Sequence, residues 1–278
     1  MSYRIIGDSC TDLTKTMKEN PNIKLVPLTL MVDDISIVDD ETFNQQDFLS
    51  KVKACPRSPK SACPSPEAYM QHFDCDSDVY VVTLSSQLSG SYNSAEVAKN
   101  IYLEDHPDKN IAIIDSRSAS IGQTLITKKL IELIEEKHSF EEIVNIITAF
   151  RDEMCTKFVI ETLETLRKNG RLSGLQAFIA SALNIKPVMG ATPEGTICKI
   201  DQARGIVKAL LQMVKSIEQD VIKPHEKTLG IAHCNCLERA EYIKNEILKR
   251  IPFKDCLIVE TAGVSSMYAN EGGIIVCY

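Results

Sequence analysis

Hydroxyl side chains gather in one short segment, residues 84–91, which reads Leu-Ser-Ser-Gln-Leu-Ser-Gly-Ser. The segment follows an apolar run at residues 79–82, typical of a buried strand, and precedes small and apolar residues at helical spacing. The first turn of a helix leaves backbone N–H groups unpaired, and these groups together with hydroxyls can hold an anion. A helix start that is merely capped would use the same residue types. The candidate anion-binding residues of this segment are Ser85, Ser86, Ser89 and Gly90.

The same order of strand, Ser-containing turn and helix occurs twice more. Residues 3–6 lead into Gly-Asp-Ser, with Thr11 and Asp12 as expected helix caps, and residues 111–114 lead into Asp-Ser before a helix over 123–136. Three such units predict parallel strands joined by crossover helices. Ligands of these sheets lie beyond the carboxyl ends of the strands, so we expect the three turns to converge on one edge.

Two other segments could add to the same pocket. Residues 55–66 contain four prolines and Ser61, which favours either a rigid connector or a rim that contributes one hydroxyl. Arg171 follows a glycine and is either a solvated helix end or a positive charge that faces the anion. A guanidinium group suits a carboxylate or a phosphate.

Other chemistries lack their usual motifs. The chain has no Gly-x-Gly-x-x-Gly fingerprint, no P-loop and no Gly-x-Ser-x-Gly, and no histidine has an aspartate three residues before it. A serine hydrolase that acts on small esters through Ser9 or Ser86 is the alternative function. The ten cysteines form no Cys-x-x-Cys pair, so we expect neither a metal site nor a cofactor.

Composition narrows the class of protein. The chain has 278 residues, 44% of them hydrophobic, and a net charge of -7, which disfavours nucleic acid as a partner. No apolar run reaches the length of a membrane span and no signal peptide is visible, so we expect a cytoplasmic protein. We expect two α/β domains, with a parallel sheet and crossover helices in residues 1–160 and a mixed sheet with helices in residues 161–278.

Periodicity predicts further elements. The expected helices cover residues 41–53, 67–73, 139–154, 176–184, 206–218 and 238–250. The expected strands cover residues 23–32, 228–233, 257–261 and 273–277, with a hairpin over 188–197.

Nine short segments, in this order, resemble those of one known family. They are residues 8–13, 26–28, 61–65, 84–92, 115–116, 163–171, 185–187, 195 and 204–205. By these segments the chain resembles the DegV family of bacterial lipid-binding proteins along nearly its whole length.

The resemblance implies a long-chain fatty acid in a tunnel between two α/β domains, with its carboxylate at the Ser loops and its tail in apolar surroundings. Ser61 stands where the family usually has Thr, and Arg171 is the arginine of a Gly-Arg turn. Ser86 is the second Ser of the Ser-Ser pair and the expected donor to the carboxylate. The resemblance also implies a lipid-binding protein that is not itself an enzyme. Its partner would be a separate fatty acid kinase that phosphorylates the bound carboxylate, and its contact with a membrane surface would be transient.

The chain departs from the family near its end. Tyr268 falls where the family commonly has His, and Asn270 falls at a Gly position. A tyrosine can donate a hydrogen bond to a carboxylate but supplies no positive charge at neutral pH. Tyr268 is therefore a candidate ligand-binding residue, and fatty-acid binding follows from the resemblance more directly than the kinase step does.

Overall fold

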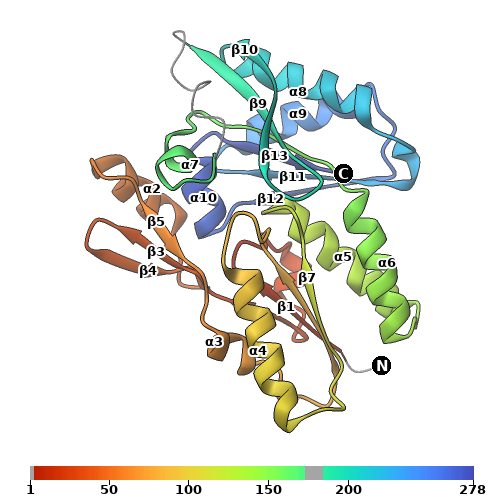
Figure 1. Ribbon diagram of the computed structural model, residues 1–278. Helices are drawn as coiled ribbons and strands as arrows, with labels where there is room; N and C mark the ends of the chain where they lie inside the picture. The colour runs from red at the N-terminus through yellow and green to blue at the C-terminus, as the bar shows by residue number, and fades with distance from the viewer. Residues whose placement is uncertain (1–2, 173–183) are drawn as a thin grey trace.

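A four-stranded parallel sheet forms the core of the N-terminal half of the molecule. In this computed structural model, which describes residues 3–172 and 184–278, the strands lie in the order β2 (Ile23–Val26), β1 (Tyr3–Asp8), β6 (Asp78–Thr83) and β7 (Ile111–Asp115) (Figure 1). All three pairings are parallel, which confirms the predicted strands and their crossover connections.

Helices cover both faces of this sheet because the strands carry apolar side chains on both sides. Two helices, α3 (Pro66–Met70) and α4 (Ser91–Asp105), cover one face, and α5 (Ile121–Glu135) and α6 (Phe140–Asp152) cover the other. Ser65 caps α3, with Pro66 at its first position, as predicted. The capping box that Ser139 and Glu142 form at the start of α6 is also present.

Proline 27 divides the second predicted strand. Residues 23–32 do not form one strand: β2 ends at Val26 and β3 (Thr29–Val32) continues in a different sheet. Proline cannot donate a hydrogen bond to a neighbouring strand, so the pairing changes there. The second sheet is small and antiparallel, with β3 between β4 (Ile35–Val38) and β5 (Lys60–Ala62), and α2 (Gln45–Ala54) connects β4 to β5 along the chain.

A six-stranded mixed sheet forms the C-terminal half. Its order is β10 (Ile197–Arg204), β9 (Ile185–Ala191), β8 (Thr156–Val159), β13 (Ile274–Cys277), β11 (Thr228–His233) and β12 (Asp255–Glu260). Only β11 and β12 pair in parallel among these strands, and β9 and β10 form the predicted hairpin. Strand β8 lies just before residue 160 yet belongs to this sheet, and the division into domains at residue 160 stays a prediction.

The remaining helices lie around the second sheet and at its junction with the first. They are α7 (Glu164–Lys168), α8 (Ile206–Asp220), a 3-10 turn (Pro224–Glu226), α9 (Leu237–Leu248) and α10 (Gly263–Ala269). Most of the predicted helix 176–184 lies outside the described residues. None of the described helices is both long and apolar enough to cross a membrane.

The helix after β1 begins later than predicted. The short helix α1 (Lys15–Lys18) is capped by Thr14, so the prediction that Thr11 and Asp12 cap it is wrong. Asp12 is buried and accepts a hydrogen bond from the backbone N–H of Ala262 in the C-terminal half. Its side chain therefore joins the two halves.

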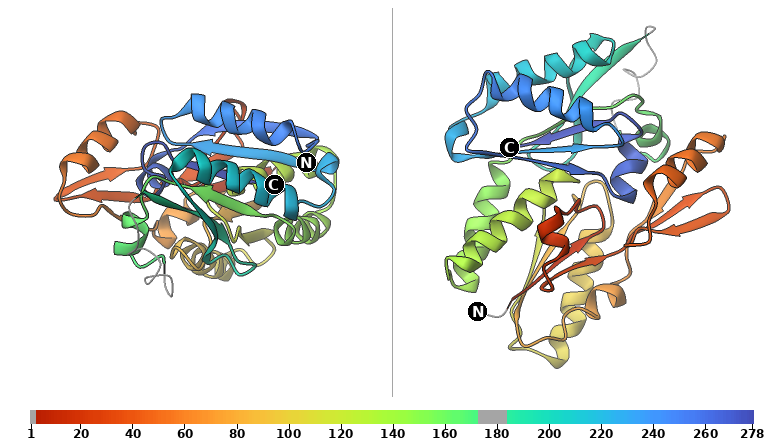
Figure 2. Two further views of the ribbon diagram at one scale, coloured as in Figure 1. Left: turned by 90° about the horizontal axis from the view of Figure 1, so that it is seen from above. Right: turned by 180° about the vertical axis from the view of Figure 1, so that it is seen from behind.

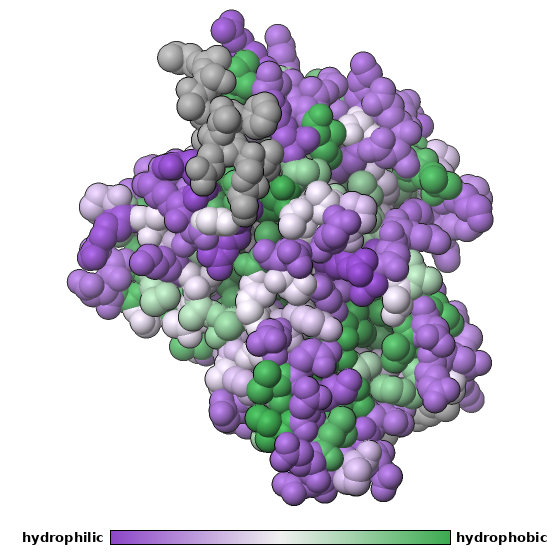
Figure 3. All heavy atoms as spheres, in the orientation of Figure 1, coloured by the Kyte–Doolittle hydropathy of each residue, from purple (hydrophilic) through white to green (hydrophobic). Residues whose placement is uncertain are grey.

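Helix α5 belongs to the cores of both halves. Ile126 and Leu130 pack on the parallel sheet, whereas Ile121 and Leu125 pack against β11 and β13 of the mixed sheet. Gly230 of β11 makes this approach feasible, because a Cβ atom there would lie 2.5 Å from Ile121. Figure 2 shows α5 reaching from one half to the other. Figure 3 shows that polar side chains cover most of the face of the molecule that is seen in Figure 1.

Candidate ligand-binding cavity

The three Ser-containing turns meet at the carboxyl edge of the parallel sheet, as predicted. The backbone N–H of Leu84 donates to Asp8 Oδ2 over 2.7 Å, and that of Ser85 donates to the carbonyl oxygen of Ser118 over 2.9 Å. The N–H of Ser86 donates to Asp115 Oδ1 over 3.1 Å. These bonds tie the turns after β1, β6 and β7 into one surface that faces the C-terminal half.

An apolar cavity lies between this surface and the mixed sheet. It holds about 880 Å³ of empty space, which includes space open to solvent. Both halves supply its apolar wall, which includes Leu28, Leu84, Phe158, Ile160, Val264 and Ile275. Two arginines are the only charged residues among the described residues that line it. The cavity therefore suits a largely apolar molecule.

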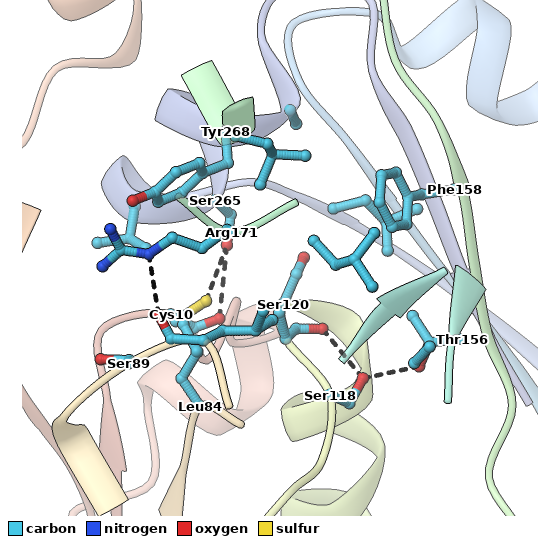
Figure 4. A pocket seen from close by; sticks show the side chains of 18 of the residues that line it. Cys10, Leu84, Ser89, Ser118, Ser120, Thr156, Phe158, Arg171, Ser265 and Tyr268 are labelled. Carbon is cyan, nitrogen blue, oxygen red and sulfur yellow. Dashed lines mark hydrogen bonds between the residues drawn. The ribbon is translucent and has the colours of Figure 1, made fainter. Parts of the chain in front are cut away.

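One end of the cavity is polar and positive (Figure 4). The Ser61 Oγ and the Tyr268 hydroxyl lie 3.3 Å apart, and either can donate to the other. Beside them, Arg171 Nε donates to the carbonyl oxygen of Leu88 over 3.1 Å. That partner is neutral, so the contact leaves the guanidinium charge available to an anion. Ser89 also lines the cavity near this end.

The opposite end is marked by Phe158 and by a pair of hydroxyl groups (Figure 4). Ser118 Oγ and Thr156 Oγ1 lie 2.7 Å apart, one from each half of the molecule. Because each hydroxyl has the other as its partner, this pair is satisfied without a ligand. The polar groups at this end therefore differ in role from Ser61 and Arg171.

The seven residues predicted from the sequence separate into two sets. Ser61, Ser89, Arg171 and Tyr268 line the cavity, whereas Ser85, Ser86 and Gly90 are not among the described residues of its wall. The Ser85 hydroxyl is fully buried and donates to the carbonyl oxygen of Gly195 over 2.8 Å, which makes it a link to the C-terminal half. Gly90 directly precedes α4, and a Cβ atom there would lie 2.9 Å from the Cys63 sulfur.

Several wall residues were missed by sequence reasoning. Helix α10 contributes Val264 and Ser265 as well as Tyr268, and the turn after β1 contributes Cys10. Cys10 Sγ and Ser265 Oγ lie 3.6 Å apart across the junction of the halves. Residues 262–266, which read Ala-Gly-Val-Ser-Ser, could have indicated a close contact by their small side chains. Burial raises the pKa of the Cys10 thiol well above its usual value, so the thiol stays protonated.

Three buried carboxylates lie beneath this end of the sheet. Burial raises the pKa of Asp8, that of Asp12 to about 7 and that of Asp39 to about 6. Asp8 has donors from the N-terminal half, including Gln123 Nε2 at 2.8 Å. Asp12 and Asp39 instead accept backbone N–H groups at the start of α10.

A hydrolytic role for the first Ser turn has no support in this geometry. The Ser9 hydroxyl is buried, donates to Asp39 Oδ2 over 2.8 Å and accepts from the Leu28 N–H over 3.0 Å. None of the five histidines of the chain lines the cavity. Ser9 therefore positions the chain before β3, and it is not among the described residues that line the cavity.

Comparison with known proteins gives one consistent result. The family model of the DegV family, described as uncharacterised proteins, matches residues 2–278. A DegV domain-containing protein of Streptococcus pneumoniae is 37% identical over 282 residues, which cover 100% of this chain and 99% of that protein.

Solved structures agree with these sequence matches. A DegV family protein from Ruminococcus gnavus, described with vaccenic acid, has a TM-score of 0.98 and 46% identity, with 100% of each chain covered. The Fatty Acid Kinase (Fak) B3 protein of Streptococcus pneumoniae, loaded with linoleic acid, has a TM-score of 0.92 and 36% identity, with 100% of this chain and 99% of that chain covered.

Proposed function

The chain belongs to the DegV family, and we propose that it binds one long-chain fatty acid in the cavity between its two halves. The observation that carries this proposal is the pairing of a long apolar wall with one positive, hydroxyl-bearing end. The carboxylate lies against Arg171, Ser61, Tyr268 and Ser89, and the tail extends toward Phe158. Both relatives with bound fatty acids described above support this assignment.

The energetics favour the tail as the main source of affinity. Burial of one methylene group is worth about 0.8 kcal/mol, so a tail of sixteen carbons offers roughly 12 kcal/mol before the costs of association. A hydrogen bond to a charged group adds about 1.5–3 kcal/mol. The polar end therefore fixes the orientation of the ligand, and Ser85 and Ser86 support it through the backbone of their turn.

Presentation of the bound acid to a separate fatty acid kinase is the second part of the proposal. Its support is the similarity to the kinase B3 protein of Streptococcus pneumoniae, together with the lack of a P-loop in this chain. We also propose a cytoplasmic location. All ten cysteines are free thiols, which is typical of proteins in a reducing compartment.

Native mass spectrometry of the purified protein tests the ligand. We expect a bound species whose mass equals one fatty acid and which organic extraction removes. Covalent labelling of a serine by a fluorophosphonate probe, with turnover of a generic ester, would instead support the hydrolase.

A separate assay tests the kinase step. The loaded protein, a fatty acid kinase and ATP should yield a hydroxylamine-reactive acyl phosphate. The absence of this product would contradict the kinase step alone and leave fatty-acid binding unaffected.

A further inference from the structure

The N-terminal end of α10 is held by two buried carboxylates from the other half of the molecule. Asp39 Oδ1 accepts from the Gly263 N–H over 2.7 Å, and Asp39 Oδ2 accepts from the Val264 N–H over 2.9 Å. Asp12 Oδ1 accepts from the Ala262 N–H over 2.6 Å. Three successive backbone donors of the C-terminal half thus end on side chains of the N-terminal half.

The close approach is built into the sequence of α10. A Cβ atom at Gly263 would lie 2.4 Å from Asp39 Oδ1, so only glycine leaves room for the carboxylate. The Ser9 hydroxyl donates to Asp39 and the Ser120 hydroxyl donates to Asp12, and these bonds fix both carboxylates. Gln45 of α2 adds a bond of 2.8 Å to the Thr261 carbonyl oxygen just before the helix.

The held helix carries part of the ligand site. Val264, Ser265 and Tyr268 line the cavity, and the Tyr268 hydroxyl reaches Ser61 at the polar end. We propose that Asp12 and Asp39 are positioning residues for the ligand: they anchor α10 to the N-terminal half and so hold Tyr268 over the carboxylate end of the cavity. This inference rests on the proposed function for its ligand, though the anchor itself can be measured without one.

The anchor makes ligand retention depend on pH. The titratable groups around the pair are Asp8 and the Cys10 thiol. The neutral partners of the two carboxylates are the hydroxyls of Ser9, Ser120 and Ser265. Breaking the anchor exposes both carboxylates to water, where their pKa values fall toward 3.8, so protons are released. Low pH therefore favours the anchored state and high pH favours its loss.

Two substitutions separate the geometry of the anchor from its charge. In Asp39→Asn the amide NH2 must face one of the N–H groups of α10, so at least one bond is replaced by two opposed donors. In Asp12→Asn the amide oxygen can still accept from Ala262 while its NH2 group donates to Ser120. Asp40→Asn is the matched control, because the Asp40 carboxylate bonds only to Thr42 among the described contacts.

Dissociation of a fluorescent fatty acid, measured by stopped flow from pH 5.5 to 8.5, tests the proposal. We expect dissociation from Asp39→Asn to be about tenfold faster at every pH. We expect the rate to rise with pH in the unmodified protein and in Asp40→Asn, and to rise less in Asp12→Asn. The carboxylate of the ligand titrates in the same way with the unmodified protein and all three variants, so differences between their pH profiles come from the protein. An unchanged rate in Asp39→Asn, or equal pH profiles in Asp12→Asn and the unmodified protein, would overturn the proposal.

Hydrogen exchange of the lipid-free protein keeps the anchor distinct from the proposed function. Amides of residues 262–264 should be protected in the unmodified protein, Asp12→Asn and Asp40→Asn, and exposed in Asp39→Asn. If this pattern of protection is found but the unmodified protein fails to bind any added fatty acid, the proposed function is refuted and the anchor is retained. Protection that is the same in all four proteins would refute the anchor.

Discussion

Arg171 is the residue that gives the polar end of the cavity its positive charge. In Arg171→Gln the amide can still reach the Leu88 carbonyl oxygen, but the charge is lost. We expect affinity for a fatty acid to fall about ten- to a hundredfold, the equivalent of about 1.5–3 kcal/mol. Isothermal titration with the unmodified protein as reference measures this. The control is Arg167→Gln, whose exposed pair with Glu164 contributes little, and an equal loss in both variants would contradict the assignment.

Tyr268 contributes a neutral hydroxyl rather than a charge. Removal of that hydroxyl in Tyr268→Phe leaves the ring in place and frees Ser61 from its 3.3 Å contact. We expect affinity to fall only about three- to tenfold, less than for the loss of a hydrogen bond to a charged group, because the freed Ser61 hydroxyl can donate to the carboxylate instead. Tyr242→Phe on the exposed face of α9 is the control for the same titration. A loss as large as that of Arg171→Gln would mean that Tyr268 has another role.

The sequence located the region of the site better than the individual donors. A Ser-rich turn after a buried strand was sufficient to predict a polar surface at the sheet edge. It could not predict that the Ser85 hydroxyl donates to Gly195, because that partner lies in the other half and 110 residues away. The same limit explains why the prediction that Thr11 and Asp12 cap a helix is wrong: the donor to Asp12 is the backbone N–H of Ala262, 250 residues away.

At the scale of elements, long segments with clear periodicity were predicted well and short ones were missed. Helices α5, α6 and α8 and the hairpin of β9 and β10 follow from apolar spacing and turn residues. Strand β5 has three residues inside a proline-rich segment, so its pairing with β3 has no local signal. That pairing is nevertheless what brings Ser61, opposite Leu30, to the cavity.

The hairpin of β9 and β10 should limit the length of the tail. Ala191 lines the cavity beside Gly190, which lies opposite Lys157 of β8 between Thr156 and Phe158. A larger side chain in Ala191→Phe fills space at this end, and overpacking costs about 1–3 kcal/mol for the longest acids. Fatty acids extracted from the variant should therefore be shorter on average by mass spectrometry. The control is Ala149→Phe, at an exposed position of α6, which should leave the distribution of chain lengths unchanged. An unchanged distribution in Ala191→Phe as well would mean that the tail does not run past Ala191.

The whole molecule is joined by contacts that cross between its halves. Helix α5 packs on both sheets, and the carboxylates of Asp12 and Asp39 hold α10. A cavity between two separately folded bodies would change shape as they moved, whereas a shared helix keeps its two walls at a fixed distance. The same junction contains the buried carboxyl groups of Asp12 and Asp39. A change of pH therefore affects both the contact between the halves and the stability of the whole fold.

The free energy of unfolding should therefore fall as pH rises from about 5 to 8. Folding raises the pKa of Asp12 from 3.8 to about 7 and that of Asp39 from 3.8 to about 6, so the folded state binds more protons than the unfolded state between these values. The stability that these two groups contribute begins to fall above pH 3.8, falls most steeply up to about pH 6 and levels off above pH 7. Burial lowers the pKa of His72 and His233, which opposes this trend below pH 6.5. Urea unfolding at pH 5 and pH 8 measures the difference, which should shrink in Asp12→Asn; higher stability at pH 8 in the unmodified protein would contradict the burial of these charges.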